Sequence, residues 1–118
     1  MASVVFLSSD LMFASRLEPA ARAAGVELKQ AANAAALGTA VDSNCRLLLV
    51  DLSLSGLNLP QTIADVRGTA PAARIVAFGA HVNEAALEVA AQAGCDLVLS
   101  RGQFNKQYGE LLAQAAPS

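Results

Sequence analysis

The chain has 118 residues, of which 54% are hydrophobic and 15% are charged, and its formal net charge is −2. This length suits one domain spanning residues 1–118, and the composition is that of a globular rather than a disordered chain. The eight Lys and Arg residues are scattered, so no basic stripe is present and nucleic-acid binding is not expected. The start lacks a secretory pattern and no stretch nears ~18 consecutive apolar residues, which predicts a soluble cytoplasmic protein without membrane contact.

Short apolar runs alternate with segments of helical spacing along the chain. The runs predict strands at 4–7, 26–29, 46–50, 74–78 and 96–100. Apolar residues spaced by three and four predict three helix faces. These faces are Phe13, Leu17, Ala20, Ala21 and Ala24; Val82, Ala86, Val89, Ala90 and Ala93; and Phe104, Tyr108, Leu111, Leu112 and Ala115.

Glycines and asparagines mark the helix ends. Gly25 and Gly94 stand where left-handed helix C-caps belong. Two weaker helices are predicted at 33–42 and 59–69, the second capped by Asn58. Pro19 falls inside the first helix, where it removes a backbone donor, so we expect a kink there.

The order is therefore strand then helix, five times over. Near-continuous apolar strands that alternate with helices indicate a parallel sheet covered on both faces, which is a three-layer α/β/α arrangement. Right-handed crossovers favour a doubly wound sheet with strand order 2-1-3-4-5. Ligands of such folds collect at the carboxyl ends of the strands. The residues at those ends are Ser8, Ser9, Asp10, Asp51, Gly79, Ala80, Ser100, Arg101 and Gly102.

This set of strand ends resembles the receiver domain of two-component response regulators, which has the flavodoxin-like strand order. The most specific stretches are "LLLVDLSLSG", similar to the phosphoacceptor strand and loop, and "AAQAGCDLVLSRG", similar to the segment from the fourth helix through the fifth strand. The resemblance covers essentially the whole chain. It implies that Asp51 stands where the family's aspartate receives a phosphoryl group.

The other positions that carry the family's chemistry differ. The acidic pair that holds Mg²⁺ in the family falls on Ser8 and Ser9, with Asp10 following. The Ser or Thr after strand four falls on Gly79, and the Lys after strand five falls on Arg101. These departures predict an atypical receiver, or pseudo-receiver, with a degenerate phosphorylation site.

Two residues have alternative roles. Asp10 suits the N-cap of the first helix better than a metal ligand, so a Mg²⁺ site built from Asp10 and Asp51 is doubtful. Arg101 is expected to form a two-pronged salt bridge with Asp51, in preference to anchoring an incoming phosphoryl group.

Other chemistries lack their signatures. No nucleotide-binding glycine motif, nucleophile elbow or cluster of metal ligands is present. Cys45 and Cys95 are expected to be reduced, buried thiols, and the lone His81 a surface or capping residue. A hydrolase triad of Ser8 or Ser9 with His81 and Asp51 is disfavoured, and the chain is not expected to be an enzyme.

The leading hypothesis is a signal-transduction module of two-component (phosphorelay) type that acts mainly by protein–protein interaction. Its expected partners are a sensor kinase or another signalling protein, with a homodimer through the last two helices as one arrangement. Leu87 and Ala91 are expected on the outer side of the fourth helix. The alternatives are a working phosphoacceptor with an atypical Mg²⁺ site at Asp51, and a small-ligand binder that uses the cleft at Asp51 and Arg101.

Overall fold

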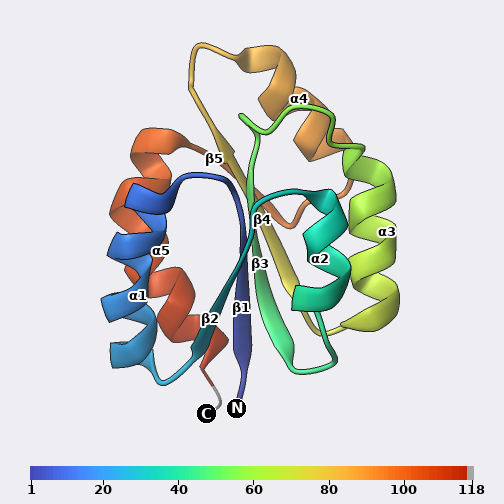
Figure 1. The fold of residues 1–118 in the computed structure, drawn as a ribbon. Coiled ribbons are helices and arrows are strands. Elements are labelled where there is room, and N and C mark those ends of the chain that lie inside the picture. Colours follow the sequence, from blue (N-terminus) through green and yellow to red (C-terminus); the bar gives the residue numbers. More distant parts are fainter. Residues whose placement is uncertain (117–118) are drawn as a thin grey trace.

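A computed structural model describes residues 1–116, and it contains a five-stranded, wholly parallel sheet in the order β2-β1-β3-β4-β5 (Figure 1). This confirms the fold class and strand order expected from the sequence. The strands are β1 (Ser3–Leu7), β2 (Glu27–Ala31), β3 (Cys45–Asp51), β4 (Arg74–Gly79) and β5 (Leu97–Ser100).

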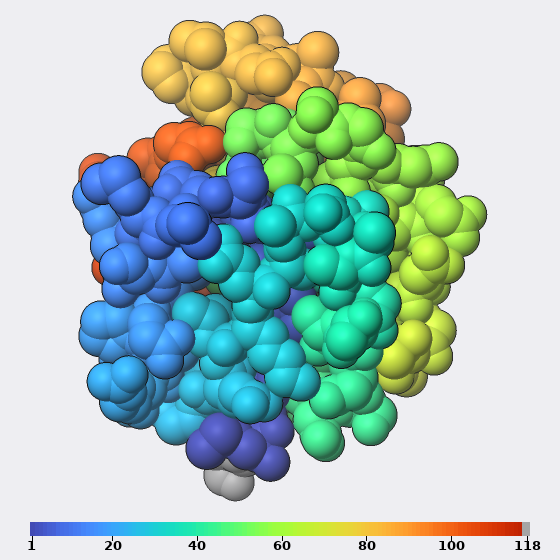
Figure 2. Space-filling model, viewed as in Figure 1, coloured from blue at the N-terminus to red at the C-terminus, as the bar shows by residue number. Residues whose placement is uncertain are grey.

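Five helices cover the two faces of this sheet. They are α1 (Leu11–Ala24), α2 (Ala34–Ala40), α3 (Leu59–Thr69), α4 (Glu84–Gln92) and α5 (Arg101–Ala115). Helices α1 and α5 lie on one face, and α2, α3 and α4 lie on the other (Figure 1). Figure 2 shows the molecule from the side on which α1 and α2 flank the edge strand β2.

The sheet divides the core into two clusters. Alternate residues of a strand point to opposite faces, so Leu47 and Leu49 join the α1/α5 side while Leu48 and Val50 join the α2/α3/α4 side. These central-strand residues are fully buried or nearly so. By contrast, β2 lies at an edge and keeps a polar sequence, and this explains why its predicted bounds of 26–29 lie slightly early.

Local sequence signals set most helix boundaries. The side chains of Asn33, Asn58 and Asn83 each accept a hydrogen bond from a backbone N–H in the first turn of α2, α3 and α4. Gly25 closes α1 with φ of +75°, a conformation that glycine adopts without steric cost. Helix α1 runs unbroken through Pro19.

The predicted buried face of the fourth helix is confirmed at Ala90, which is fully buried, and at Ala93, which packs against the core, but it is wrong at Val82 and Val89. In α4 only Ala90 is fully buried, whereas Val82 and Val89 are 79% and 54% exposed. Leu87, which was expected on the outer side, is half-buried instead, and Ala91 is exposed. The helix begins at Glu84 rather than at Val82 and is rotated so that Leu87 turns toward the end of β4.

The structure also bears on the two cysteines, the single histidine and the expected absence of a membrane-spanning segment. Cys45 is buried and Cys95 is half-buried, and both are free thiols. His81 lies exposed in the loop after β4. Over residues 1–116, no helix combines the length and the apolar character that a membrane crossing requires.

Candidate functional site

The register of the sheet brings the sequence-predicted residues to one edge. Leu7 of β1 pairs with Val50 of β3, so Ser8 and Asp51 follow as neighbours at the strand ends. On the other side of β3, Asp51 pairs with Phe78 of β4. Alternate residues of β3 point to the same face of the sheet, so the side chain of Asp51, like those of Leu47 and Leu49, points toward the layer formed by α1 and α5.

The carboxylate of Asp51 is buried, with 2% of the residue exposed, and both of its oxygens accept hydrogen bonds. Oδ2 accepts from the hydroxyl of Ser8 at 2.6 Å. Oδ1 accepts from the backbone N–H of Ser53 at 2.9 Å and from the Ser53 hydroxyl at 2.7 Å. Three donors therefore compensate much of the desolvation that burial imposes on this charge.

The two serines after β1 have different environments. Ser8 is fully buried, and its Oγ also accepts a 3.0 Å hydrogen bond from the backbone N–H of Asp10. Ser9 is exposed, and no hydrogen bond joins its side chain to Asp51. Of these two serines, only Ser8 donates a hydrogen bond to Asp51.

Arg101 lies between two carboxylates. Its Nη2 is 3.6 Å from Asp51 Oδ1, and its Nη1 is 3.9 Å from Asp10 Oδ2. The expected two-pronged contact with Asp51 is thus absent, because the guanidinium divides its two nitrogens between the two acids. The three side chains together carry one net negative charge.

Helix α5 holds Arg101 in this position. No loop separates β5 from α5, since Ser100 caps the helix and Arg101 is its first residue. Ser100 and Gln103 form a reciprocal capping box, with hydrogen bonds of 2.8 and 3.1 Å. The guanidinium carbon also lies 5.7 Å from the centroid of the Phe78 ring, which is within cation–π range.

The carboxylates of Asp10 and Asp51 are not arranged as ligands of a Mg²⁺ ion. Mg²⁺ takes an octahedral shell of oxygens, usually one or two carboxylates with waters and phosphate oxygens. Here Asp10 caps α1 through a 2.9 Å bond from Phe13 N–H to Oδ1, and its other oxygen faces Arg101. Asp51 also faces Arg101, so a positive side chain stands between the two candidate ligands. Within residues 1–116, no three His, Cys, Asp or Glu side chains gather as a metal site.

Gly79 is buried on the opposite face of the sheet from Asp51. A Cβ built on Gly79 would lie 3.2 Å from Leu52 Cβ, 3.4 Å from Leu52 Cδ1 and 3.7 Å from Leu87 Cδ2. The space that a hydroxyl-bearing side chain would need at position 79 is therefore bounded by two leucines. This apolar packing accounts for the inward turn of Leu87.

Sequence reasoning missed two contributors. Ser53 provides two of the donors to Asp51, and the spacing of an acid followed two residues later by a serine is typical of a turn closed by the acid's side chain. Leu52 packs beside Gly79, and no pattern in the sequence signals that contact.

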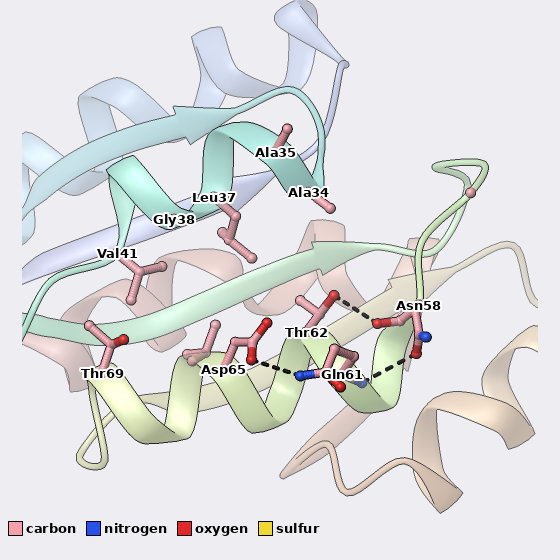
Figure 3. Close-up of a pocket in the computed structure, with 12 residues that line it drawn as sticks. Ala34, Ala35, Leu37, Gly38, Val41, Asn58, Gln61, Thr62, Asp65 and Thr69 are labelled. Carbon is pink, nitrogen blue, oxygen red and sulfur yellow. Dashed lines mark hydrogen bonds between the residues drawn. The ribbon is translucent and has the colours of Figure 1, made fainter.

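The surface has one hollow beside the candidate site and another between α2 and α3. A hollow of about 520 Å³ beside Arg101 is lined by Asp10, Met12, Phe13, Arg16, Gly102 and Asn105. A groove of about 340 Å³ runs between α2 and α3, with Leu37 and Val41 on one wall and Thr62 and Asp65 on the other (Figure 3). The side-chain hydrogen-bond and ion-pair partners of Asp51 among the described residues, Ser8, Ser53 and Arg101, do not line this second groove.

Comparison with known proteins gives matches in structure alone. No protein-family model matches the sequence, and no curated protein matches it. The receiver domain of a response regulator from Clostridium thermocellum superposes with a TM-score of 0.76 at 12% identity, covering 98% of this chain and 94% of that one. The chain therefore has the fold of receiver domains.

Two other solved structures are similarly related. The receiver domain of the sensor histidine kinase PA1611 from Pseudomonas aeruginosa, with magnesium in its active-site cleft, matches with a TM-score of 0.71 at 17% identity, over 96% of this chain and 95% of that one. A candidate pilus assembly protein (cpaE) from Burkholderia thailandensis matches with a TM-score of 0.69 at 18% identity, over 98% of both chains.

Proposed function

We propose that this chain is a receiver-like signal-transduction module of two-component (phosphorelay) type, with a degenerate phosphorylation site, that acts mainly by protein–protein interaction and is not an enzyme. The observation that carries the proposal is the position of Arg101, whose guanidinium contacts both Asp10 and Asp51. The receiver fold of the neighbours supports the signalling role, and the local chemistry supports the loss of phosphorylation.

The chemical argument concerns the charge that phosphoryl transfer develops. The transferred group brings several negatively charged oxygens to the accepting carboxylate, and a metal ion ordinarily neutralises them. Here Ser8 provides a hydroxyl where a second carboxylate would bind that metal ion, and Arg101 already neutralises Asp51. Asp51 is then a structural acceptor of hydrogen bonds rather than a nucleophile.

Phosphorylation of the purified protein tests this proposal. The chain is incubated with Mg²⁺ and acetyl phosphate, and its intact mass is measured beside that of an Asp51→Asn variant. We expect neither protein to gain the mass of a phosphoryl group. A gain by the native chain that the variant lacks would support the alternative of a working phosphoacceptor at Asp51.

A second measurement separates metal binding from phosphorylation. Beryllofluoride binds carboxylates as a phosphoryl mimic and depends on a bound divalent ion. We expect no change in melting temperature when Mg²⁺, alone or with beryllofluoride, is added to the native protein. A rise with Mg²⁺ alone would support an atypical metal site from Asp10 and Asp51.

The interaction role predicts partners. One structural neighbour is described as a candidate pilus assembly protein, so the same fold also occurs in a protein that carries another description. A sensor kinase or another signalling protein is the proposed partner class. A homodimer through α4 and α5 is a specific form of this proposal, and small exposed residues such as Ala91, Gly109 and Ala113 would allow close approach there.

Sedimentation equilibrium tests the homodimer. We expect self-association that an Ala113→Glu substitution weakens, since it places a charge on the exposed face of α5. The matched substitution Ala36→Glu on the exposed surface of α2 should leave the association unchanged. A native chain that is monomeric at high concentration would remove the homodimer but not the interaction role.

A further inference from the structure

One groove on the α2/α3/α4 side of the sheet is lined by aliphatic side chains. The segment between β3 and α3 forms one wall, and α4 forms the other, enclosing about 250 Å³. In Figure 2 the residues around 80–90 stand out at the top of the molecule, above those around 50–60. The residues that line this α4 groove are Leu52, Leu54, Leu57, Ala85, Ala86 and Val89, together with Leu59 at the start of α3.

The apolar surface of the groove is accessible. Leu52, Leu54 and Leu57 are half-buried, and Val89 is 54% exposed. The volume falls below the range of about 300–1,000 Å³ that is usual for drug-sized ligands, so the groove suits a few side chains of a protein segment better than a small molecule.

One edge of the α4 groove is acidic. Glu84 and Glu88 are four residues apart and lie on one row of α4, and the neighbouring row presents Ala85 and Val89 to the groove. Both glutamates are exposed. Two like charges at this spacing repel each other within a helix, so a cation placed beside them would stabilise α4.

No basic side chain in this part of the chain neutralises the two glutamates. Between residues 47 and 100 the sequence has two arginines, Arg67 and Arg74, no lysine and one histidine, His81, which forms no ion pair with either glutamate. Arg67 pairs with Asp96 at 3.3 Å, and Arg74 donates to Gln114 at 2.8 Å. Among the described residues, neither Glu84 nor Glu88 takes part in an ion pair.

We propose that the α4 groove binds an amphipathic helix of a partner protein that carries aliphatic residues on one row and Lys or Arg on the adjacent row. The aliphatic row fills the space between Leu54, Leu57 and Val89, and the basic row faces Glu84 and Glu88. Anionic membranes and nucleic acids are poor occupants, because the two carboxylates repel phosphate groups. This inference gives a partner chemistry to the proposed interaction role, but it needs no phosphorylation of Asp51.

The groove is also connected to the candidate site. Leu52 follows Asp51 directly, and its side chain lines the groove while packing at Gly79 together with Leu87 of α4. A helix that fills the groove therefore contacts the residue next to the buried aspartate. Its binding should shift the backbone amide resonances of Leu52 and Ser53.

The test uses a designed peptide of about 18 residues, long enough to hold helical structure, with Leu on one row and Lys on the next. A twin peptide replaces every Lys by Glu. Fluorescence anisotropy gives the affinities, and amide chemical shifts of the ¹⁵N-labelled chain locate the binding. We expect the Lys peptide to bind at least about tenfold more tightly than its twin and to shift residues of the α4 groove.

Variants of the chain make the expectation specific. Val89→Asp should weaken binding of the Lys peptide by about tenfold or more, and Glu84→Lys with Glu88→Lys should reverse the preference toward the Glu twin. The control Glu110→Lys, on the exposed surface of α5, should change the affinity by less than about twofold.

Several results would overturn the inference. They are equal binding of both peptides, shifts confined to α1 and α5, or self-association that Val89→Asp abolishes and Ala113→Glu leaves unchanged, which would make a second copy the occupant. Because none of these measurements involves acetyl phosphate or Mg²⁺, this inference and the proposed loss of phosphorylation fail on different results.

Discussion

The hydroxyl of Ser8 and the carboxylate of Asp51 share a buried hydrogen bond of 2.6 Å that joins the carboxyl ends of β1 and β3. A carboxylate in place of Ser8 would add a second negative charge beside Asp51 and would require a cation for compensation. The serine instead provides a donor. The buried carboxylate of Asp51 therefore receives hydrogen bonds from Ser8 and Ser53 and lies beside the Arg101 guanidinium.

Removal of the Ser8 hydroxyl should destabilise the fold. Ser8→Ala leaves Asp51 Oδ2 and the N–H of Asp10 without their partner, so we expect the free energy of unfolding to fall by about 1–3 kcal/mol. Urea denaturation measures this change. Ser9→Ala is the matched control, and since Ser9 is exposed, its effect should stay within about 0.5 kcal/mol.

Removal of the Arg101 charge should both destabilise the protein and create metal binding. Arg101→Gln leaves Asp10 and Asp51 without their shared cation, and we expect a loss of about 1 kcal/mol, between the values for exposed and buried pairs. Millimolar Mg²⁺ should then raise the melting temperature of the variant, although it leaves the native protein unchanged. An equal response of both proteins would show that Arg101 does not control access to the two carboxylates.

A hydroxyl at position 79 should be poorly tolerated. Gly79→Ser places Cβ 3.2 Å from Leu52 Cβ, so we expect a loss of about 1–3 kcal/mol from overpacking. The cost should be smaller in a Leu52→Ala background, because the Cδ1 atom at 3.4 Å is then gone. Gly68→Ser is the control, since nothing lies within 4 Å of a Cβ at that helical position and its stability should be unchanged or slightly higher.

The thiol of Cys95 should be unreactive at neutral pH. Burial, followed by the nearby Asp96 carboxylate, raises the pKa of Cys95 from 9.0 to about 11. Since the thiolate is the reactive form, alkylation by iodoacetamide at pH 8 should be slow in the folded protein and fast in denaturant.

The same shift predicts a dependence of stability on pH. The unfolded chain releases the Cys95 proton near pH 9.0 and the folded chain near pH 11, so the contribution of Cys95 is fully present below pH 9.0 and is lost as the pH rises toward 11. A Cys95→Ala variant should show a shallower decline in unfolding free energy over this window. An identical slope in both proteins would contradict the assignment to Cys95.

Most of the fold could be predicted because its signals are local. Apolar runs such as residues 46–50 identify buried strands, and cap residues such as Asn58 and Gly25 identify helix ends. Helix α4 was the exception. Alanine is compatible with both buried and exposed faces, so an alanine-rich helix does not determine its own rotation, and the packing of Leu87 at Gly79 decided it.

The sequence predicts which residues lie at the candidate site, but it does not predict which of their atoms contact one another. The strand ends indicated Ser8, Asp51 and Arg101, because parallel strands deliver their carboxyl ends to one edge. The division of Arg101 between two acids depends on α5 beginning without a loop, and the spacing of charged residues along the chain does not determine that geometry. The role of Ser53 depends in the same way on the turn that follows β3.

The aromatic residues have an uneven distribution across the sheet. All four phenylalanines belong to the cluster on the α1/α5 side, where Phe78 and Phe104 stack with centroids 4.1 Å apart, and Tyr108 packs against them. The chain has one Tyr and no Trp. Near-ultraviolet circular dichroism and intrinsic fluorescence therefore monitor one layer of the molecule, and melting of α2, α3 and α4 would pass unseen by either probe. An unfolding curve that looks cooperative by tyrosine emission has to be matched by far-ultraviolet data before the two layers can be said to unfold together.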